Sequence, residues 1–145
     1  MLKGLNPLLT PDLLYVLRSM GHGDEIAIVD GNFPAESWGP QLVRVDGAGA
    51  SAVLDAVLSV MSLDPDFDVA AFRPNVSQAN GDTLPIFVEF EKLVTKHEGE
   101  KAKLGALERP AFYERSRKAY AIVATGERRL HGNVILRKGV VAPAA

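Results

Sequence analysis

Apolar residues recur at helical spacing in several stretches of the chain. The clearest stretch begins at Thr10, which can cap a helix, and at Pro11, which suits a first helical turn. Leucine and methionine side chains then form one apolar face until Gly21 or Gly23 ends the pattern. On this basis we expect helices over residues 11–20, 51–61, 86–96 and 112–117.

Short apolar runs alternate with these expected helices. Residues 26–29 are apolar without alternation, which is typical of a strand covered on both faces. Similar runs predict strands over residues 42–45, 69–73, 119–124 and 134–137. The segment 96–107 is the most polar connection, and we expect no regular element in it. The alternation of helices and strands predicts one layered α/β domain over residues 1–145.

The composition narrows the classes of function. The chain has no cysteine, which removes disulfides, thiol nucleophiles and cysteine-ligated zinc. Its formal net charge of -2 gives no bulk attraction to nucleic acid or to an anionic membrane. No apolar run is long enough to cross a bilayer, and the first residues hold no signal-peptide core. We therefore expect a cytoplasmic protein with no nucleic-acid or membrane partner.

The segment around His22 is the first candidate for chemistry. The histidine lies between two glycines, just before an expected strand, and Asp30 follows that strand. Imidazole can give and take a proton near neutral pH, and an aspartate at the carboxyl end of a strand lies where α/β sheets bind ligands. The pattern indicates acid–base groups in a pocket, but it also fits a helix end, a buried strand and a polar turn.

Two further polar clusters come late in the chain. Arg109 precedes a short expected helix, where a guanidinium can hold a hydroxyl or an oxyanion, or form an ordinary surface ion pair. His131, Gly132 and Asn133 precede the last expected strand, and the glycine backbone and the amide suit a sugar-like polyol or simply a connection. No histidines share metal-site spacing and no nucleotide-binding glycine motif is present, so we expect neither metal nor nucleotide.

Taken together, the segments of the chain resemble a known family, the sugar mutarotases related to fucose mutarotase and ribose pyranase. The segments that carry the resemblance are Met1-Leu2-Lys3-Gly4, Met20-Gly21-His22-Gly23-Asp24-Glu25, Asp30-Gly31-Asn32-Phe33-Pro34, Gly39-Pro40-Gln41, Ala111-Phe112-Tyr113-Glu114-Arg115, Ala121-Ile122-Val123, Thr125-Gly126-Glu127, Gly132-Asn133 and Lys138-Gly139-Val140. The likeness spans nearly the whole chain in order, and Arg109 with the Phe-Tyr-Glu-Arg segment is closer to the fucose branch.

The resemblance implies roles for individual residues. His22 is expected to be the proton-transfer residue, with Asp30 and Arg109 contacting the sugar. The family's Tyr-Gly-Asn or Tyr-Ala-Asn segment lines the pocket, and here it reads His131-Gly132-Asn133, with histidine in place of tyrosine. Tyr120 is a further candidate for the pocket wall. We also expect Asp30 to orient His22 while it accepts a sugar hydroxyl.

The resemblance also implies the fold, the reaction and the assembly. The fold is expected to be a three-layer α/β/α domain with a largely parallel or mixed central sheet. The expected activity is that of a cofactor-free isomerase that interconverts the α and β anomers of a free monosaccharide, with L-fucose as the favoured substrate. D-ribose pyranase activity and a non-catalytic monosaccharide-binding module remain alternatives. The family further implies a ring-shaped homo-oligomer, often a decamer, with sites at subunit boundaries.

Overall fold

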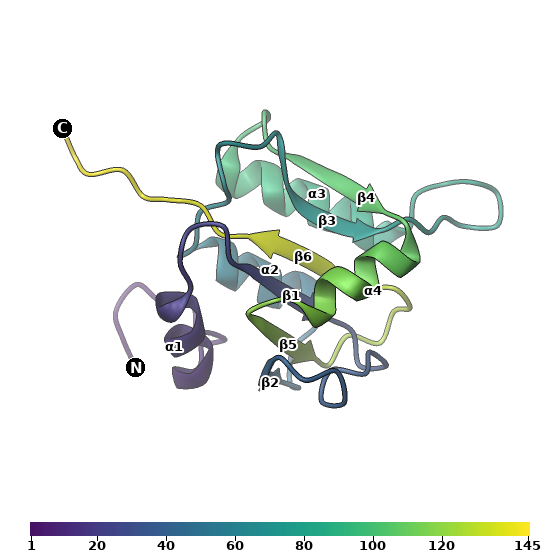
Figure 1. Ribbon diagram of the computed structural model, residues 1–145, viewed down its shortest axis with the longest axis horizontal. Coiled ribbons are helices and arrows are strands. Elements are labelled where there is room, and N and C mark those ends of the chain that lie inside the picture. Colours follow the sequence, from purple (N-terminus) through teal and green to yellow (C-terminus); the bar gives the residue numbers. More distant parts are fainter.

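Ten regular elements follow one another along residues 1–145 of the computed structural model. The helices are α1 (Pro11–Ser19), α2 (Ala50–Leu58), α3 (Pro85–Glu98) and α4 (Arg109–Arg117). The strands are β1 (Glu25–Val29), β2 (Gln41–Val45), β3 (Val69–Pro74), β4 (Lys103–Leu107), β5 (Ala121–Thr125) and β6 (Val134–Arg137). Figure 1 shows the strands side by side, with the chain after β6 leading away from the sheet.

The six strands form one mixed sheet in the order β2-β5-β1-β6-β3-β4. Strands β2, β5 and β1 pair in parallel, as do β3 and β4. Strand β6 is antiparallel to both of its neighbours, β1 and β3. The five parallel strands therefore end at one edge of the sheet, and β6 begins at that same edge.

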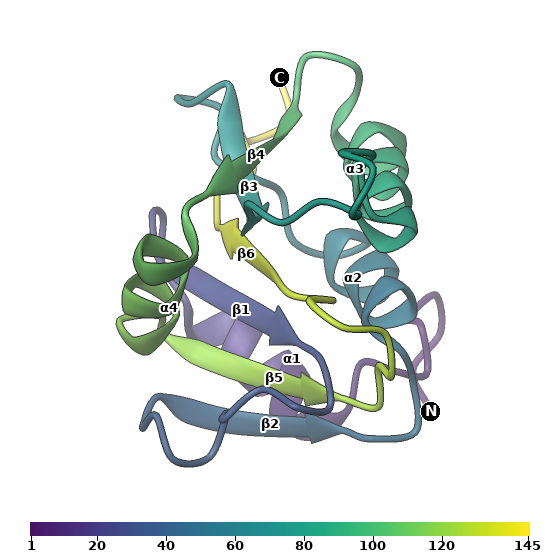
Figure 2. The same cartoon turned by 90° about the vertical axis from the view of Figure 1, so that its right-hand side faces the viewer.

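Helices cover both faces of this sheet and give the three layers that the resemblance implied. Helices α1, α2 and α3 pack on one face, where Leu54, Phe87 and Phe90 belong to a cluster of 27 buried residues. Helix α4 lies on the other face, where Phe112 packs into a smaller cluster of seven. Figure 2 shows α4 on the opposite side of the sheet from α2 and α3. No helix is both long and apolar enough to span a membrane.

Local sequence explains the start of the first helix and its direction. The Oγ1 atom of Thr10 accepts a hydrogen bond of 3.2 Å from the backbone amide of Leu13, and Pro11 occupies the first turn, as expected. At the other end, the ammonium of Lys138 donates to the carbonyls of Leu17 and Met20. This cation satisfies carbonyls that the helix leaves free, so it fixes the direction in which the chain leaves α1.

The expected elements are present, with one correction. The segment 96–107, expected to be an irregular connection, contains strand β4. This strand lies at the sheet edge, pairs only with β3 and leaves its side chains exposed or half-buried, so its sequence shows no continuous run of large apolar residues. The last expected helix begins at Arg109 rather than at residue 112, because Pro110 suits a first helical turn.

Candidate functional site

A cavity of about 380 Å³ opens where the parallel strands end. Its polar lining includes Asp30, which follows β1, and Asn133, which precedes β6. His131 lies beside them, so residues from two separate segments meet at this edge. The volume falls within the roughly 300–1,000 Å³ of small-molecule sites.

Asp30 and Asn133 are fixed to one another. The backbone amide of Asp30 donates a 2.7 Å hydrogen bond to Oδ1 of Asn133. Oδ1 of Asp30 in turn accepts a 2.9 Å bond from the backbone amide of Asn32. Both residues are only 5% exposed. The second carboxylate oxygen and the Asn133 amide nitrogen carry no bond within the chain, so one acceptor and one donor remain for a ligand.

The backbone at His131 is strained. Its φ of 63° makes it the only non-glycine residue with a positive φ. The next residue must be small, because a Cβ on Gly132 would lie 2.8 Å from Cγ of Glu127. A left-handed histidine costs energy and persists where the surrounding structure enforces it, as it often does at ligand sites.

Aromatic rings form the apolar wall of the cavity. Phe33 and Trp38 meet edge to face with ring centres 5.0 Å apart, and Trp38 meets Tyr113 at 5.5 Å. The guanidinium of Arg117 covers the Trp38 ring at 4.2 Å. A polar side opposite a rigid aromatic wall suits a small ligand that has hydroxyls on one face and C–H groups on the other.

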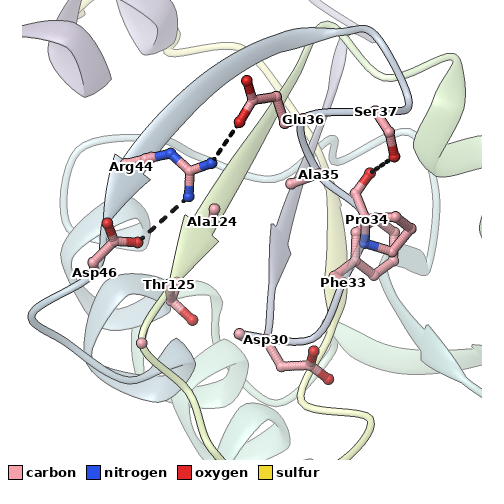
Figure 3. A pocket seen from close by; sticks show the side chains of 12 residues that line it. Asp30, Phe33, Pro34, Ala35, Glu36, Ser37, Arg44, Asp46, Ala124 and Thr125 are labelled. Atoms are coloured by element: carbon pink, nitrogen blue, oxygen red, sulfur yellow. Dashed lines mark hydrogen bonds and ion pairs between the residues drawn. The ribbon is translucent and has the colours of Figure 1, made fainter.

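Two further hollows adjoin this cavity. One of about 520 Å³ shares Asp30 and Phe33 with it and extends over the ends of β2 and β5. Figure 3 shows the guanidinium of Arg44 in that hollow between Glu36, at 2.9 Å, and Asp46, at 3.8 Å. The other, of about 500 Å³, contains the exposed Arg109 and shares Tyr113 with the aromatic wall.

His22 lies at the opposite edge of the sheet, before β1 begins. Its Nε2 atom is 3.1 Å from Oδ1 of Asp64 and 3.8 Å from Oδ2 of Asp66. The other oxygen of Asp64 accepts a 2.9 Å bond from Nε of Arg137. The Arg137 bond, with a smaller contribution from His22, lowers the pKa of Asp64 to about 2 despite its burial. The imidazole therefore faces a buried, ionised carboxylate.

The structure brings together part of the predicted site. Asp30, His131, Gly132 and Asn133 meet at one edge of the sheet, and Arg109 lies beyond Tyr113. His22 is separated from them by β1, whose five residues span about 16 Å.

Two expectations, the pairing of Asp30 with His22 and the place of Tyr120 in the cavity wall, are not met within one chain. The expected pairing of Asp30 with His22 does not occur within one chain, because Asp64 occupies that place. Tyr120 precedes β5, and its amide donates to Glu25 at the same edge as His22, away from the cavity.

Sequence reasoning missed three residues of these sites. Asp64 precedes a proline, which indicates only a turn, and nothing in the sequence assigns Trp38 and Tyr113 to the pocket wall. His22, Asp64 and Asp66 also place their ligand atoms within 4.8 Å of one another, as a cation site would. Arg137 already neutralises Asp64, so this group is better explained as an ion-pair network, and the absence of a metal stays a prediction.

A three-layer α/β domain with a polar, aromatic-walled cavity at the carboxyl edge of its sheet belongs to the small-ligand-binding α/β proteins. Comparison with known proteins identifies the family. The chain belongs to the RbsD / FucU transport protein family, whose model matches residues 3–141.

Individual relatives agree with this assignment. The human fucose mutarotase is 45% identical over an alignment that covers 97% of this chain and 95% of that protein. The structure of a fucose mutarotase from Streptococcus pneumoniae in complex with L-fucose superposes with a TM-score of 0.89 at 42% identity, covering 97% of this chain and all of that one. Bacillus subtilis RbsD complexed with D-ribose has a TM-score of 0.75 at 19% identity over 98% of this chain, which supports the fold alone.

Proposed function

We propose that this protein is an isomerase that interconverts the α and β anomers of free L-fucose without a cofactor. The observation that carries the proposal is the cavity in which Asp30 and Asn133 face an aromatic wall. A pyranose offers hydroxyls to the polar pair and C–H groups to the rings. Relatives more than 40% identical over nearly the whole chain are named fucose mutarotases.

The reaction needs only proton transfer. A proton reaches the ring oxygen, the anomeric hydroxyl loses its proton, and the bond between C1 and the ring oxygen breaks to give the open aldehyde. Rotation about the C1–C2 bond and closure on the other carbonyl face give the opposite anomer. A positioned acid–base group contributes about 10²–10⁴-fold to such a step. We assign that role to His22, with Asp30, Arg109, His131 and Asn133 holding the sugar.

The working form, we infer, is a homo-oligomer, with the ring-shaped decamer that the resemblance implies as the expected assembly. Within one chain His22 and the cavity lie at opposite edges of the sheet, so His22 cannot act on a sugar beside Asp30. A second copy that brings its His22 edge to this cavity would complete the site. A chain that stays monomeric would bind sugar without turnover, which is the non-catalytic alternative.

The decisive test measures NMR saturation transfer between the anomeric proton signals of L-fucose, with D-ribose in parallel. Faster exchange on fucose than on ribose supports the proposal. Exchange on ribose alone indicates a pyranase, and binding without exchange indicates a sugar-binding module.

Mixed assemblies test the shared site. His22→Ala and Asn133→Ala chains, each inactive alone, should regain exchange when they are co-expressed in one oligomer, because some boundaries then combine an intact His22 with an intact Asn133. Failure to regain activity in mixed oligomers of confirmed composition would overturn the shared site and the catalytic role of His22 at this cavity.

A further inference from the structure

Segment 126–133 carries His131 and Asn133 but contains no helix or strand. A site residue on an irregular segment needs something else to hold it, because loops are otherwise the mobile part of a domain. The only acidic side chain buried in this segment is Glu127, which is 6% exposed. In the sequence, Glu127 stands out only as part of the Thr125-Gly126-Glu127 segment of the family resemblance.

The Glu127 carboxylate is surrounded by hydrogen-bond donors. Its Oε1 accepts from the backbone amide and from Nε of Arg129, both at 3.0 Å. Its Oε2 accepts from the backbone amide of Ala50 at 3.1 Å and from Nη2 of Arg129 at 3.2 Å. Ala50 is the first residue of α2, so the carboxylate also caps a helix that has no side-chain cap of its own.

Arg129 extends this network to helix α3. Its guanidinium makes two bonds to Glu89, of 2.7 and 3.0 Å, and Glu89 also accepts a 2.5 Å bond from the hydroxyl of Ser51. The segment is thereby tied to the first turns of both α2 and α3. The Arg129 bond lowers the pKa of Glu127 to about 2, against the opposing effect of burial, so the carboxylate is ionised at neutral pH.

Glu127 also contacts the chain next to Asp30 and next to Asn133. Its carbonyl accepts a 2.9 Å bond from the amide of Gly31, the residue after Asp30. Its Cγ packs against Gly132 so closely that no side chain fits there. It therefore contacts the immediate neighbours of Asp30 and of Asn133, the two residues whose mutual bond forms the polar side of the cavity.

We propose that Glu127 is a positioning residue: its carboxylate holds segment 128–133 against α2 so that Asn133 meets Asp30 and the sugar cavity is formed before a ligand arrives. This inference rests on the proposed function only in its choice of ligand. The same clamp explains why His131 keeps a strained backbone, since Arg129 and Gly132 on either side of it are held by Glu127.

Glu127→Gln is the informative variant. Glutamine keeps the shape, but its amide NH₂ would face donors where the carboxylate had only acceptors. We expect the Kd for L-fucose to rise at least about tenfold, with exchange at saturating sugar falling less than exchange at low sugar. The amide NMR signals of Asp30 and Asn133 should shift in the free protein.

Asp55→Asn is the matched control. Its carboxylate also joins α2 to α3, through Lys96 at 2.9 Å and His97 at 2.7 Å, but it lines none of the hollows around the cavity. This variant should lower the Tm while leaving sugar affinity and the Asp30 amide signal unchanged. If Glu127→Gln fails to fold, Arg129→Lys, which keeps the charge and loses the forked geometry, should give the same changes in smaller measure.

The outcomes separate the two proposals. Wild-type Kd and unmoved Asp30 and Asn133 signals in Glu127→Gln, at a lowered Tm, would overturn the positioning role and leave Glu127 merely structural. If the wild-type protein binds neither L-fucose nor D-ribose, the proposed function fails. The positioning role is then tested by the amide signals and by hydrogen exchange at Asp30, because these two measurements need no sugar.

Discussion

His22 and Asp64 form a directed pair: Nε2 of the imidazole lies 3.1 Å from Oδ1 of a carboxylate whose other oxygen, Oδ2, accepts a bond from Arg137. A nitrogen that faces an ionised carboxylate carries the proton, which leaves Nδ1 as the nitrogen that can exchange a proton with a sugar. The imidazole is 45% exposed, whereas the Asp64 side chain is fully buried. The structure thus presents an oriented imidazole on the surface.

Replacing Asp64 by asparagine should reduce anomer exchange. The imidazole loses its orienting partner and its preferred tautomer, and we expect at least about tenfold of the ~10²–10⁴-fold acid–base contribution to be lost. Asp66→Asn is the control, because that carboxylate is 3.8 Å away and 71% exposed. Saturation transfer on both variants checks the difference. An equal loss in both would argue against a specific orienting role for Asp64.

The Asn133→Asp variant should keep the fold but bind sugar more weakly. An aspartate oxygen can still accept the bond from the Asp30 amide, but it removes the free NH₂ donor and places a second carboxylate beside Asp30. We expect sugar affinity to fall about tenfold or more and stability to fall by about 1–2 kcal/mol. Calorimetric titration and thermal unfolding measure the two effects. Asn80→Asp, in the exposed segment 80–83, also loses an amide donor and sets two carboxylates together, but away from the cavity, and should leave sugar affinity unchanged.

The positions of Asp30 and Asn133 at the ends of strands could be predicted from the sequence. Asp30 directly follows an apolar run, and Asn133 directly precedes another, so each could be assigned to a strand end. Their meeting depends on β6 running antiparallel to β1, which places the start of one beside the end of the other. Strand direction is a tertiary property, and the alternation of helices and strands alone does not specify it.

The contact between His22 and Asp64 could not be predicted from the sequence. Asp64 lies 42 positions after His22, in a turn whose only local signal is the proline that follows it. It reaches the imidazole because Leu63 pairs with Lys138 in an isolated bridge, and because Gly23 and Asp24 bond to the backbone of Lys138. Strand β4 was missed for a related reason: an edge strand buries few side chains, so its pairing leaves little trace in the sequence.

The His131→Gly variant should be more stable than the wild-type protein but bind sugar more weakly. Glycine adopts the φ of 63° without strain, so we expect stability to rise by about 1 kcal/mol, or about 2–4 °C in Tm. The loss of the imidazole from the cavity should weaken sugar binding. His131→Asn separates the effects, because asparagine tolerates this backbone conformation and keeps a polar side chain. If the glycine variant has a lower Tm, the imidazole itself contributes packing that outweighs the backbone strain.

Acid should unfold this protein through two particular carboxylates. The pKa values of Asp64 and Glu127 lie at about 2, below their ordinary values of 3.8 and 4.5, because Arg137 and Arg129 bond the ionised forms. A carboxyl group with a lowered folded-state pKa contributes stability that is complete above its unfolded value and is lost as the pH falls toward the folded value. We therefore expect the Tm to change little between pH 7 and pH 5 and to fall steeply from about pH 4.5 to pH 2.

The Glu127→Gln variant should have a lower Tm than the wild-type protein at neutral pH. Its Tm should fall less steeply as the pH is lowered, since glutamine does not titrate. Parallel curves for the variant and the wild-type protein would show that Glu127 is not among the groups whose protonation drives acid unfolding.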